Sequence, residues 1–261
     1  PEVVVTNVMV CVKRVPGASG QILLSDDGQT VDARHVGYTV SSHDECAVAH
    51  AVTIATATGG EATVLTLGSA DALEQVRDAV AVGCTGAVLL ETEAESYGPA
   101  DVAAAIAEVV RAREAEGAAV DLVLVGNDAA DTGDFQVGVR LAYQLDRPVL
   151  TGISTVEVSD GTAVAQGAGP EGTEVFELPL PAVIAIQEGG IEPRYPSIPG
   201  RMKAKRTPVD TITPKVDPVG SGRIRLKLPP EQPSNVEILG EGAEAAPALV
   251  DLLYSIGVVP K

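Results

Sequence analysis

The chain has 261 residues, and 45% of them are hydrophobic, which is enough to bury one sizeable core. Its formal net charge of −18 makes non-specific binding to nucleic acid unfavourable. Trp is absent and only two Phe occur. The abundant Ala, Val and Gly therefore favour close packing of helices on a sheet over a jelly roll or a TIM-type enzyme with an aromatic pocket.

The three cysteines, Cys11, Cys46 and Cys84, are scattered and form no C-x-x-C pair. We interpret them as small buried residues in a reducing compartment, and we expect no metal site. No apolar run approaches the length of a membrane span, and no signal peptide is recognised. These features predict a cytoplasmic protein that does not insert into a membrane.

The first half of the chain alternates predicted strands and helices. Short apolar, β-branched runs predict strands over 3–12, 62–67, 87–90 and 120–125. Periodic patterns predict helices over 42–57, 70–82, 99–116 and 135–145, the first opened by a capping box of Ser42 and Glu45. This order predicts a Rossmann-like α/β fold, with a mostly parallel sheet and helices on both faces. Ligands bind at the carboxyl ends of such strands, which are followed here by loops 13–19, 68–70 and 127–134.

The pattern changes after Pro148. Two strands, 153–158 and 162–165, flank Asp160-Gly161 as a hairpin, and two more follow at 174–178 and 182–187. A loop rich in Pro and Gly, 188–206, leads into a short basic helix, so we expect an α/β domain over 1–206 with antiparallel additions. Residues 207–222 are predicted to be a linker, and 240–256 an amphipathic helix. Such a helix cannot bury its apolar face alone, so 207–261 are expected to form an arm that docks on this domain or on a partner.

The strand, polar loop and helix around Gly126 form the arrangement that aims backbone N–H groups at an anion. Asp128, Asp131 and Asp134 would repel a phosphate. However, Asp is also a preferred turn and capping residue, and main-chain donors alone can hold phosphate. The loop matches neither G-x-G-x-x-G nor the P-loop. A nucleotide site and an ordinary strand-to-helix turn both remain open at this point.

Basic residues are concentrated in one stretch of this acidic chain. Residues 194–227 hold nine of the eighteen Lys and Arg, and only Asp210 and Asp217 oppose them. This basic belt indicates a specific partner with a negative surface, although a solvated loop with random charge is the simpler alternative.

Four stretches together resemble the β subunit of electron transfer flavoprotein. They are Val10-Cys-Val-Lys-Arg-Val-Pro16, Asp44-Glu45 with the Ala-rich helix, the Gly126–Gly138 loop, and Glu192-Pro-Arg-Tyr195 through Met202-Lys-Ala-Lys205. The last stretch is the most specific. The resemblance covers nearly the whole chain and is weakest over 208–233.

This resemblance implies a heterodimer with an electron transfer flavoprotein α subunit. One FAD lies mainly on α and is shared with β, and it carries electrons from flavin dehydrogenases to a quinone-linked oxidoreductase. A buried AMP is structural in β, whereas in a bifurcating branch a second FAD takes its place and oxidises NADH. Gln136-Val137-Gly138 is more like the bifurcating branch, but Val139 stands where that branch usually has Pro, so AMP is slightly favoured.

The resemblance also implies roles for individual residues. Cofactor contacts map onto Cys11, Ser41, His43, Gly68, Asp131, Thr132, Gly133, Asp134, Phe135, Gln136 and Val137. Partner docking maps onto Gly190, Ile191, Glu192, Pro193, Arg194, Tyr195, Met202 and Lys203. Glu174 matches a residue that can contact the moving flavin domain, with a plain exposed strand residue as the alternative. Many family members carry an apolar anchor two residues before Glu-Pro, where this chain has Gly190. Either Ile191 replaces that anchor with a shifted register, or the partner is different.

No Ser-His-Asp or Cys-His set is apparent, and no catalytic residue is assigned. An electron carrier is therefore expected rather than a classical enzyme. A stand-alone adenine-nucleotide-binding protein is the alternative from another class, but it leaves the Pro-Arg-Tyr loop and the C-terminal helix unexplained.

Overall fold

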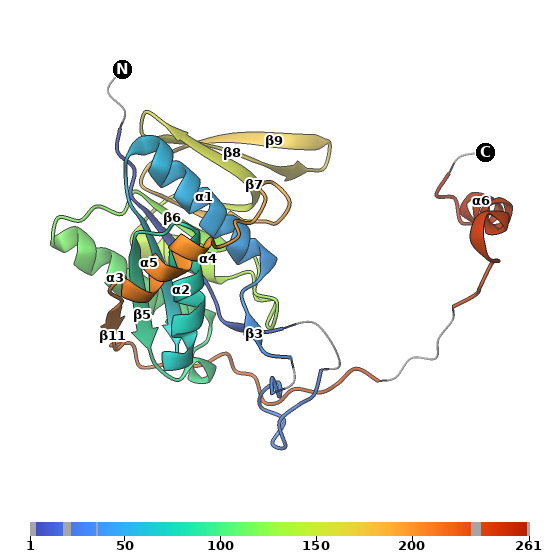
Figure 1. The fold of residues 1–261 in the computed structure, drawn as a ribbon, viewed down its shortest axis with the longest axis horizontal. Coiled ribbons are helices and arrows are strands. Elements are labelled where there is room, and N and C mark those ends of the chain that lie inside the picture. Colours follow the sequence, from blue (N-terminus) through green and yellow to red (C-terminus); the bar gives the residue numbers. More distant parts are fainter. Residues whose placement is uncertain (1–3, 18–21, 35, 231–235, 260–261) are drawn as a thin grey trace. The chain divides into compact units, whose positions relative to one another are not determined.

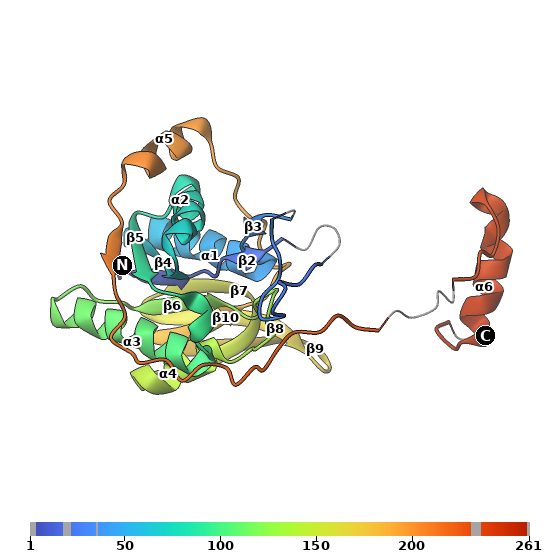
Figure 2. The same ribbon diagram turned by 90° about the horizontal axis from the view of Figure 1, so that it is seen from below.

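The computed structural model describes residues 4–17, 22–34, 36–230 and 236–259. Residue 3 of the first predicted strand and residues 18–19 of the loop after it lie outside this part. The chain divides into two compact units, Pro1–Leu226 and Lys227–Lys261. In the first unit, helices cover both faces of a large sheet (Figures 1 and 2).

The sheet has the strand order β11-β5-β4-β1-β6-β10-β7-β8-β9 within the described residues. Seven neighbours, from β11 to β7, run parallel, and β8 and β9 are antiparallel. The predicted mostly parallel α/β fold is thus confirmed. The strands are β1 Val8–Cys11, β4 Ala62–Gly68, β5 Gly86–Glu91, β6 Leu122–Gly126, β7 Val149–Ser159, β8 Thr162–Gly169, β9 Gly172–Pro179, β10 Ala182–Ile186 and β11 Asp210–Ile212. A small separate pair is formed by β2 Val15–Pro16 and β3 Tyr38–Thr39.

Helices cover both faces of the sheet, and one further helix, residues 198–206, packs on another helix instead of on the sheet (Figure 2). They are α1 Ser42–Thr58, α2 Leu73–Val82, α3 Pro99–Ala115, α4 Val137–Leu145 and α5 Ile198–Arg206, with 3₁₀ turns η1 Ala70–Ala72 and η2 Ala94–Ser96. Successive side chains of β1 point to opposite faces of the sheet. Val8 and Val10 belong to the core with α1 and α2, whereas Met9 and Cys11 belong to the core with α3 and α4. A strand buried on both faces reads as a continuous apolar run, as β1 does.

The start of α1 differs from the predicted capping box. Ser41, not Ser42, is the N-cap, and its Oγ accepts from the backbone N–H of Asp44 at 3.2 Å. The helix ends as predicted at Gly59, which has φ 72°. The capping pattern therefore predicted the helix, but it was misplaced by one residue.

Two pairings after Pro148 also differ from the sequence-based prediction. β10 lies between β6 and β7 and is parallel to both, so only β8 and β9 are antiparallel additions. Residues 207–222, predicted to be a linker, contain β11, which pairs with β5. The same segment is held further along where Tyr97 Oη donates to the carbonyl of Val216 at 3.1 Å and Gly220 N–H donates to Asp101 Oδ2 at 2.8 Å. In the described residues around Gly28, Leu24 and Val31 form an isolated antiparallel bridge.

The second unit contains η3 Gly242–Ala245 and helix α6 Ala246–Ser255. None of the α6 residues is buried, and its apolar side chains include the exposed Leu249, Val250, Leu252 and Tyr254. No helix in the described part of the chain has the length and apolarity needed to span a bilayer.

Candidate functional site

The predicted ligand loops meet at one edge of the sheet. Cys11 at the end of β1 is in register with Leu65 of β4 and Val125 of β6, so the loops that follow these strands leave the same edge. Lys13, just after β1, joins the loop after β6: its Nζ lies 2.7 Å from Asp131 Oδ1 and 3.3 Å from Thr132 Oγ1. This contact confirms that the two loops are neighbours in space.

Asp44 is a buried acidic residue at this edge of the sheet. Its Oδ2 accepts from the backbone N–H of Lys13 at 3.0 Å, and a Cβ at Gly126 would overlap its Oδ1. Burial raises the pKa of Asp44 to about 7, although hydrogen bonds from Lys13, Ser41 and Gly126 oppose the rise. The carboxyl group thus joins the first turn of α1 to the ends of β1 and β6. Sequence reasoning treated Asp44 only as part of a resemblance, because an acid near a helix N-terminus ordinarily caps it.

Cys11 is buried next to this carboxyl group. Burial, with a smaller contribution from the charge of Asp44, raises the pKa of the Cys11 thiol to about 12. Cys11 is therefore a small, neutral residue at this edge of the sheet. Ser41 contributes on the other side, since its Oγ donates to the carbonyl of Asp128 at 3.3 Å and so connects α1 with the loop after β6.

The loop after β6 carries a row of unused backbone donors. Within the described chain, no acceptor is found for the backbone N–H groups of six consecutive residues, from Asp134 to Val139. Gly133 and Phe135, at the start of this row, have positive φ values of 61° and 51°. The last three N–H groups of the row belong to the first turn of α4, where the helix dipole also favours negative charge. Free N–H groups at a helix N-terminus make this loop a candidate site for an anion.

Helix α4 begins close against the sheet. A Cβ at Gly138 would lie 2.9 Å from Val125 Cγ2, so glycine permits the close approach of α4 to β6. Gln136 is the N-cap residue, but its side chain makes no capping bond. Its Oε1 instead accepts from Arg140, at 3.0 Å from Nε and 2.8 Å from Nη2.

The remaining predicted cofactor residues are distributed around this edge. Gly68 ends β4, where a Cβ would lie 3.2 Å from Ala72 Cβ. His43, in the first turn of α1, accepts the backbone N–H of Glu188 at its Nδ1, at 3.1 Å. Glu174 lies apart from them on the edge strand β9, exposed and folded over Gly169.

The structure separates the predicted docking residues into two groups. A Cβ at Gly190 would overlap the carbonyl oxygen of Ser154, so no larger residue fits there. Ile191 is half-buried against the core that contains α1, and Cys46 Sγ donates to its carbonyl at 3.4 Å. Tyr195, Ile198 and Met202 are instead 91%, 82% and 51% exposed. Ile198 is thus an exposed aliphatic side chain close to Ile191 in the sequence, and the sequence alone does not distinguish the burial of the two isoleucines.

Helix α5 is fixed onto α2. Ser197 caps it, accepting from Gly200 N–H at 3.1 Å, and Gly200 lies so close to the carbonyl of Ala81 that a Cβ would overlap it. Arg77 donates to the carbonyls of Ala204 and Thr207 at the other end.

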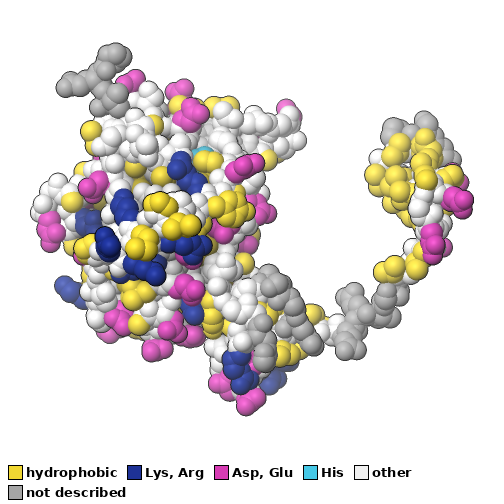
Figure 3. All heavy atoms as spheres, in the orientation of Figure 1, with side chains coloured by type: hydrophobic (Ala, Val, Ile, Leu, Met, Phe, Trp, Pro, Cys, Tyr) yellow, Lys and Arg dark blue, Asp and Glu magenta, His cyan; other side chains and the backbone are white. Residues whose placement is uncertain are grey.

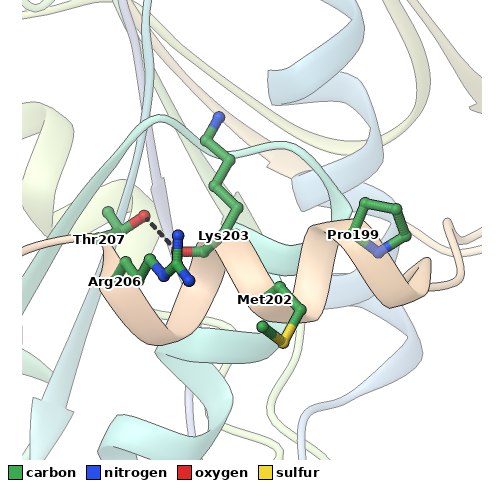
Figure 4. A pocket seen from close by; sticks show the side chains of 5 residues that line it. All are labelled: Pro199, Met202, Lys203, Arg206 and Thr207. Atoms are coloured by element: carbon green, nitrogen blue, oxygen red, sulfur yellow. Dashed lines mark hydrogen bonds between the residues drawn. The ribbon is translucent and has the colours of Figure 1, made fainter.

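The outer surface of α5 is both basic and apolar. In Figure 3, Lys and Arg side chains gather around apolar ones over the position that α5 occupies in Figure 1. A pocket of about 470 Å³ is lined by Pro199, Met202, Lys203, Arg206 and Thr207. Figure 4 shows that Lys203 and Met202 extend from α5 in different directions, with the Thr207 hydroxyl donating to the Lys203 carbonyl at 3.1 Å. In the described residues, no group of three or more His, Cys, Asp or Glu is placed to hold a metal.

Comparison with known proteins agrees with this arrangement. The family model "Electron transfer flavoprotein domain" matches residues 29–217. The chain is 32% identical to the electron transfer flavoprotein subunit beta of Bacillus subtilis over 95% of this chain and 98% of the relative, and 33% identical to that of Syntrophomonas wolfei over 94% of each. It is also 31% identical to the caffeyl-CoA reductase-Etf complex subunit CarD of Acetobacterium woodii, over 78% of this chain and 76% of the relative. The chain belongs to the electron transfer flavoprotein β-subunit family, which has an electron-transfer role and implies an α-subunit partner.

Proposed function

We propose that this chain and an α subunit form a heterodimeric electron carrier that shares one FAD and holds a structural AMP in the β subunit. The row of free backbone N–H groups from Asp134 to Val139 is the observation that carries the nucleotide assignment. Six free donors at a helix N-terminus suit a phosphate dianion without any side-chain cation. Of the three Asp residues in the loop, Asp131 is paired with Lys13, which reduces the repulsion of a phosphate.

The walls of the crevice suit an adenosine. Cys11, Ser41 and Gly68 are small, and they lie at the carboxyl ends of β1 and β4 and at the start of α1. Thr132 and Gly133 continue the loop beside Lys13. We assign Asp131–Val137 to the phosphate and these small residues to the nucleoside, in agreement with the rule that ligands of parallel sheets bind beyond the strand ends.

The chain would contact the shared flavin through His43. Because its Nδ1 accepts the Glu188 N–H, the neutral ring carries its proton on Nε2, which is left as a donor. Glu174, exposed on β9, is available to the flavin domain of the partner. When bound, FAD supplies the one-electron and two-electron chemistry.

Donor docking is assigned to the exposed face formed by Tyr195, Ile198 and Met202. Ile198 replaces Ile191 as the aliphatic anchor, since Ile191 faces the core. Arg201, Lys203, Lys205 and Arg206 surround this face, so the donor is a flavin dehydrogenase with an apolar pocket bordered by acidic residues. Glu192 and Pro193 precede Arg194, which donates to Thr53 Oγ1 at 2.9 Å and so holds the loop on α1.

The C-terminal unit is assigned to partner binding. Its helix α6 buries no residue and exposes an apolar face, and a ten-residue helix is marginal without packing. We propose that this arm binds the α subunit. The quinone-linked acceptor then receives electrons from the flavin that α carries.

Identification of the extracted nucleotides tests the proposal. The chain is co-expressed with its α subunit, purified without added nucleotide, denatured, and analysed by chromatography and mass spectrometry. One FAD and one AMP per heterodimer are expected. Two FAD and no AMP would instead assign a bifurcating role with NADH oxidation, and the absence of both nucleotides would refute the carrier assignment.

A further inference from the structure

Gln136 occupies the middle of the row of free N–H groups, and its side chain is held by Arg140. The Arg140 Nε and Nη2 both donate to the same Gln136 Oε1, at 3.0 and 2.8 Å. Gln136 is the N-cap of α4 and Arg140 follows it by four residues, a spacing at which side chains on a helix are neighbours. A guanidinium group can only donate hydrogen bonds, so the atom that faces Arg140 must be the amide oxygen.

The consequence is that the Gln136 amide has one defined orientation. Its oxygen is used twice, whereas its Nε2 has no acceptor within the described residues. The side chain thus keeps a free hydrogen-bond donor on a residue whose own backbone N–H belongs to the row. Without Arg140, rotation of the amide by half a turn would present the oxygen instead, and an oxygen repels an anion.

The charged residues around the loop also bear on phosphate binding. Asp128, Asp131 and Asp134 make the loop acidic, and Lys13 offsets this only at its first end, through Asp131. Arg140 places a second cation at the other end, where the free N–H groups lie. Neither cation has to touch a ligand to lower the cost of bringing a phosphate to this loop.

We propose that Arg140 is a positioning residue that fixes the Gln136 amide as a seventh donor to the phosphate of a bound adenylate. This inference rests on the proposed nucleotide site and adds to it one side chain, Gln136, that reads the ligand as a hydrogen-bond acceptor. An ordinary helix pair would contribute only to stability, by about 0.2–0.5 kcal/mol.

A double-mutant cycle separates the two possibilities. The purified heterodimer is depleted of nucleotide, and its affinity for AMP is measured by calorimetric titration for the wild type, Arg140→Ala, Gln136→Ala and the double variant. Each single substitution is expected to weaken AMP binding about tenfold, the size of one hydrogen bond to a charged group. In the Gln136→Ala background, Arg140→Ala is expected to change the affinity less than threefold, because its target is already gone.

Two further variants sharpen the test. Arg140→Lys keeps a donor to Oε1 and is expected to recover binding to within about threefold of the wild type. Arg111→Ala is the matched control: it removes an equal charge from α3, and its contact is with the carbonyl of Gln144 at the far end of α4. Its AMP affinity is expected to equal that of the wild type.

The inference is overturned if Arg140→Ala lowers the melting temperature without weakening AMP binding. It is also overturned if the two single effects add fully in the double variant, since Arg140 would then act independently of Gln136. Failure of the wild-type heterodimer itself to bind AMP is a different result, which refutes the proposed nucleotide site.

Discussion

The backbone N–H of Lys13 donates to Asp44 Oδ2 at 3.0 Å, and through this bond a buried carboxyl group holds the end of β1 against the start of α1. The same Lys13 extends its side chain to Asp131. One residue therefore connects the interior of the sheet edge with the outer loop of the crevice. A change at Asp44 is expected to reach the loop through this connection.

The first prediction concerns pH. The pKa of Asp44 is about 7 in the folded chain and about 3.9 when unfolded. Between these two pH values the native state binds more protons than the unfolded state. This group therefore makes the free energy of unfolding decrease as pH rises from about 4 to about 7, by up to about 1.4 kcal/mol per pH unit. Asp44→Asn removes that dependence. Urea unfolding at pH 5.5, 7 and 8 is expected to show a stability gap between wild type and variant that narrows as pH rises.

The Asp44→Asn variant is also expected to be less stable than the wild type at pH 8, by about 1–3 kcal/mol. The backbone N–H groups of Lys13 and Gly126 both donate to the carboxyl group, and the amide of Asn presents its own N–H₂ to one of them. A gap that stays constant with pH would contradict the assignment of this titration to Asp44.

The second prediction concerns Phe135. It has φ 51° and is 58% exposed, so its side chain gains little burial in return for a left-handed backbone. Phe135→Gly is expected to raise the free energy of unfolding of the nucleotide-free chain by about 0.5–1 kcal/mol. Asp160→Gly is the control. Asp160 has φ 52°, but Asp tolerates this region better than Phe, so a smaller gain in stability is expected. A loss of stability in Phe135→Gly would show that the ring makes a contact that outweighs the strain.

The third prediction separates the two isoleucines of the docking segment. Ile198→Ala is expected to slow electron uptake from the donor dehydrogenase at least tenfold, with flavin content and melting temperature unchanged, because its side chain is exposed and we assign it to donor docking. Ile191→Ala is expected to lower stability by about 1–3 kcal/mol instead, because its side chain packs against the core. Stopped-flow reduction and thermal melts measure the two effects. Slower uptake in Ile191→Ala but not in Ile198→Ala would restore the anchor to Ile191.

The fourth prediction concerns the attachment of α5. Arg77→Ala leaves the carbonyls of Ala204 and Thr207 without this donor. The end of α5 is then expected to open more readily, with amide exchange over 203–207 faster by about tenfold. Hydrogen exchange followed by mass spectrometry measures this, and Glu108→Ala on α3 serves as an exposed control. Unchanged exchange over 203–207 would mean that Gly200 packing alone holds the helix.

The sequence predicted those features that depend on local patterns. The strand before Gly126, the polar loop and α4 follow from an apolar run, a cluster of Asp and Gly, and a helical period. The parallel pairing of β10 between β6 and β7 was not predictable in this way, because it joins segments far apart in the chain and the Asp160-Gly161 hairpin suggested antiparallel neighbours.

Three features of the site depended on the three-dimensional arrangement. Ile191 and Ile198 are chemically identical, and only packing makes one a core residue and the other a surface residue. Gly190 appears in the sequence as a missing anchor, but the carbonyl of Ser154 leaves no room for one. The burial of Asp44 has no local pattern, since it results from the meeting of β1, β6 and α1.

The central claim is that main-chain amides hold the phosphate. Hydrogen exchange of the nucleotide-depleted heterodimer, with and without AMP, tests it directly at residues 134–139, whose N–H groups have no acceptor in the described chain. The account predicts that AMP slows exchange in this segment by at least tenfold. Bound AMP that leaves exchange over 134–139 unchanged would contradict it.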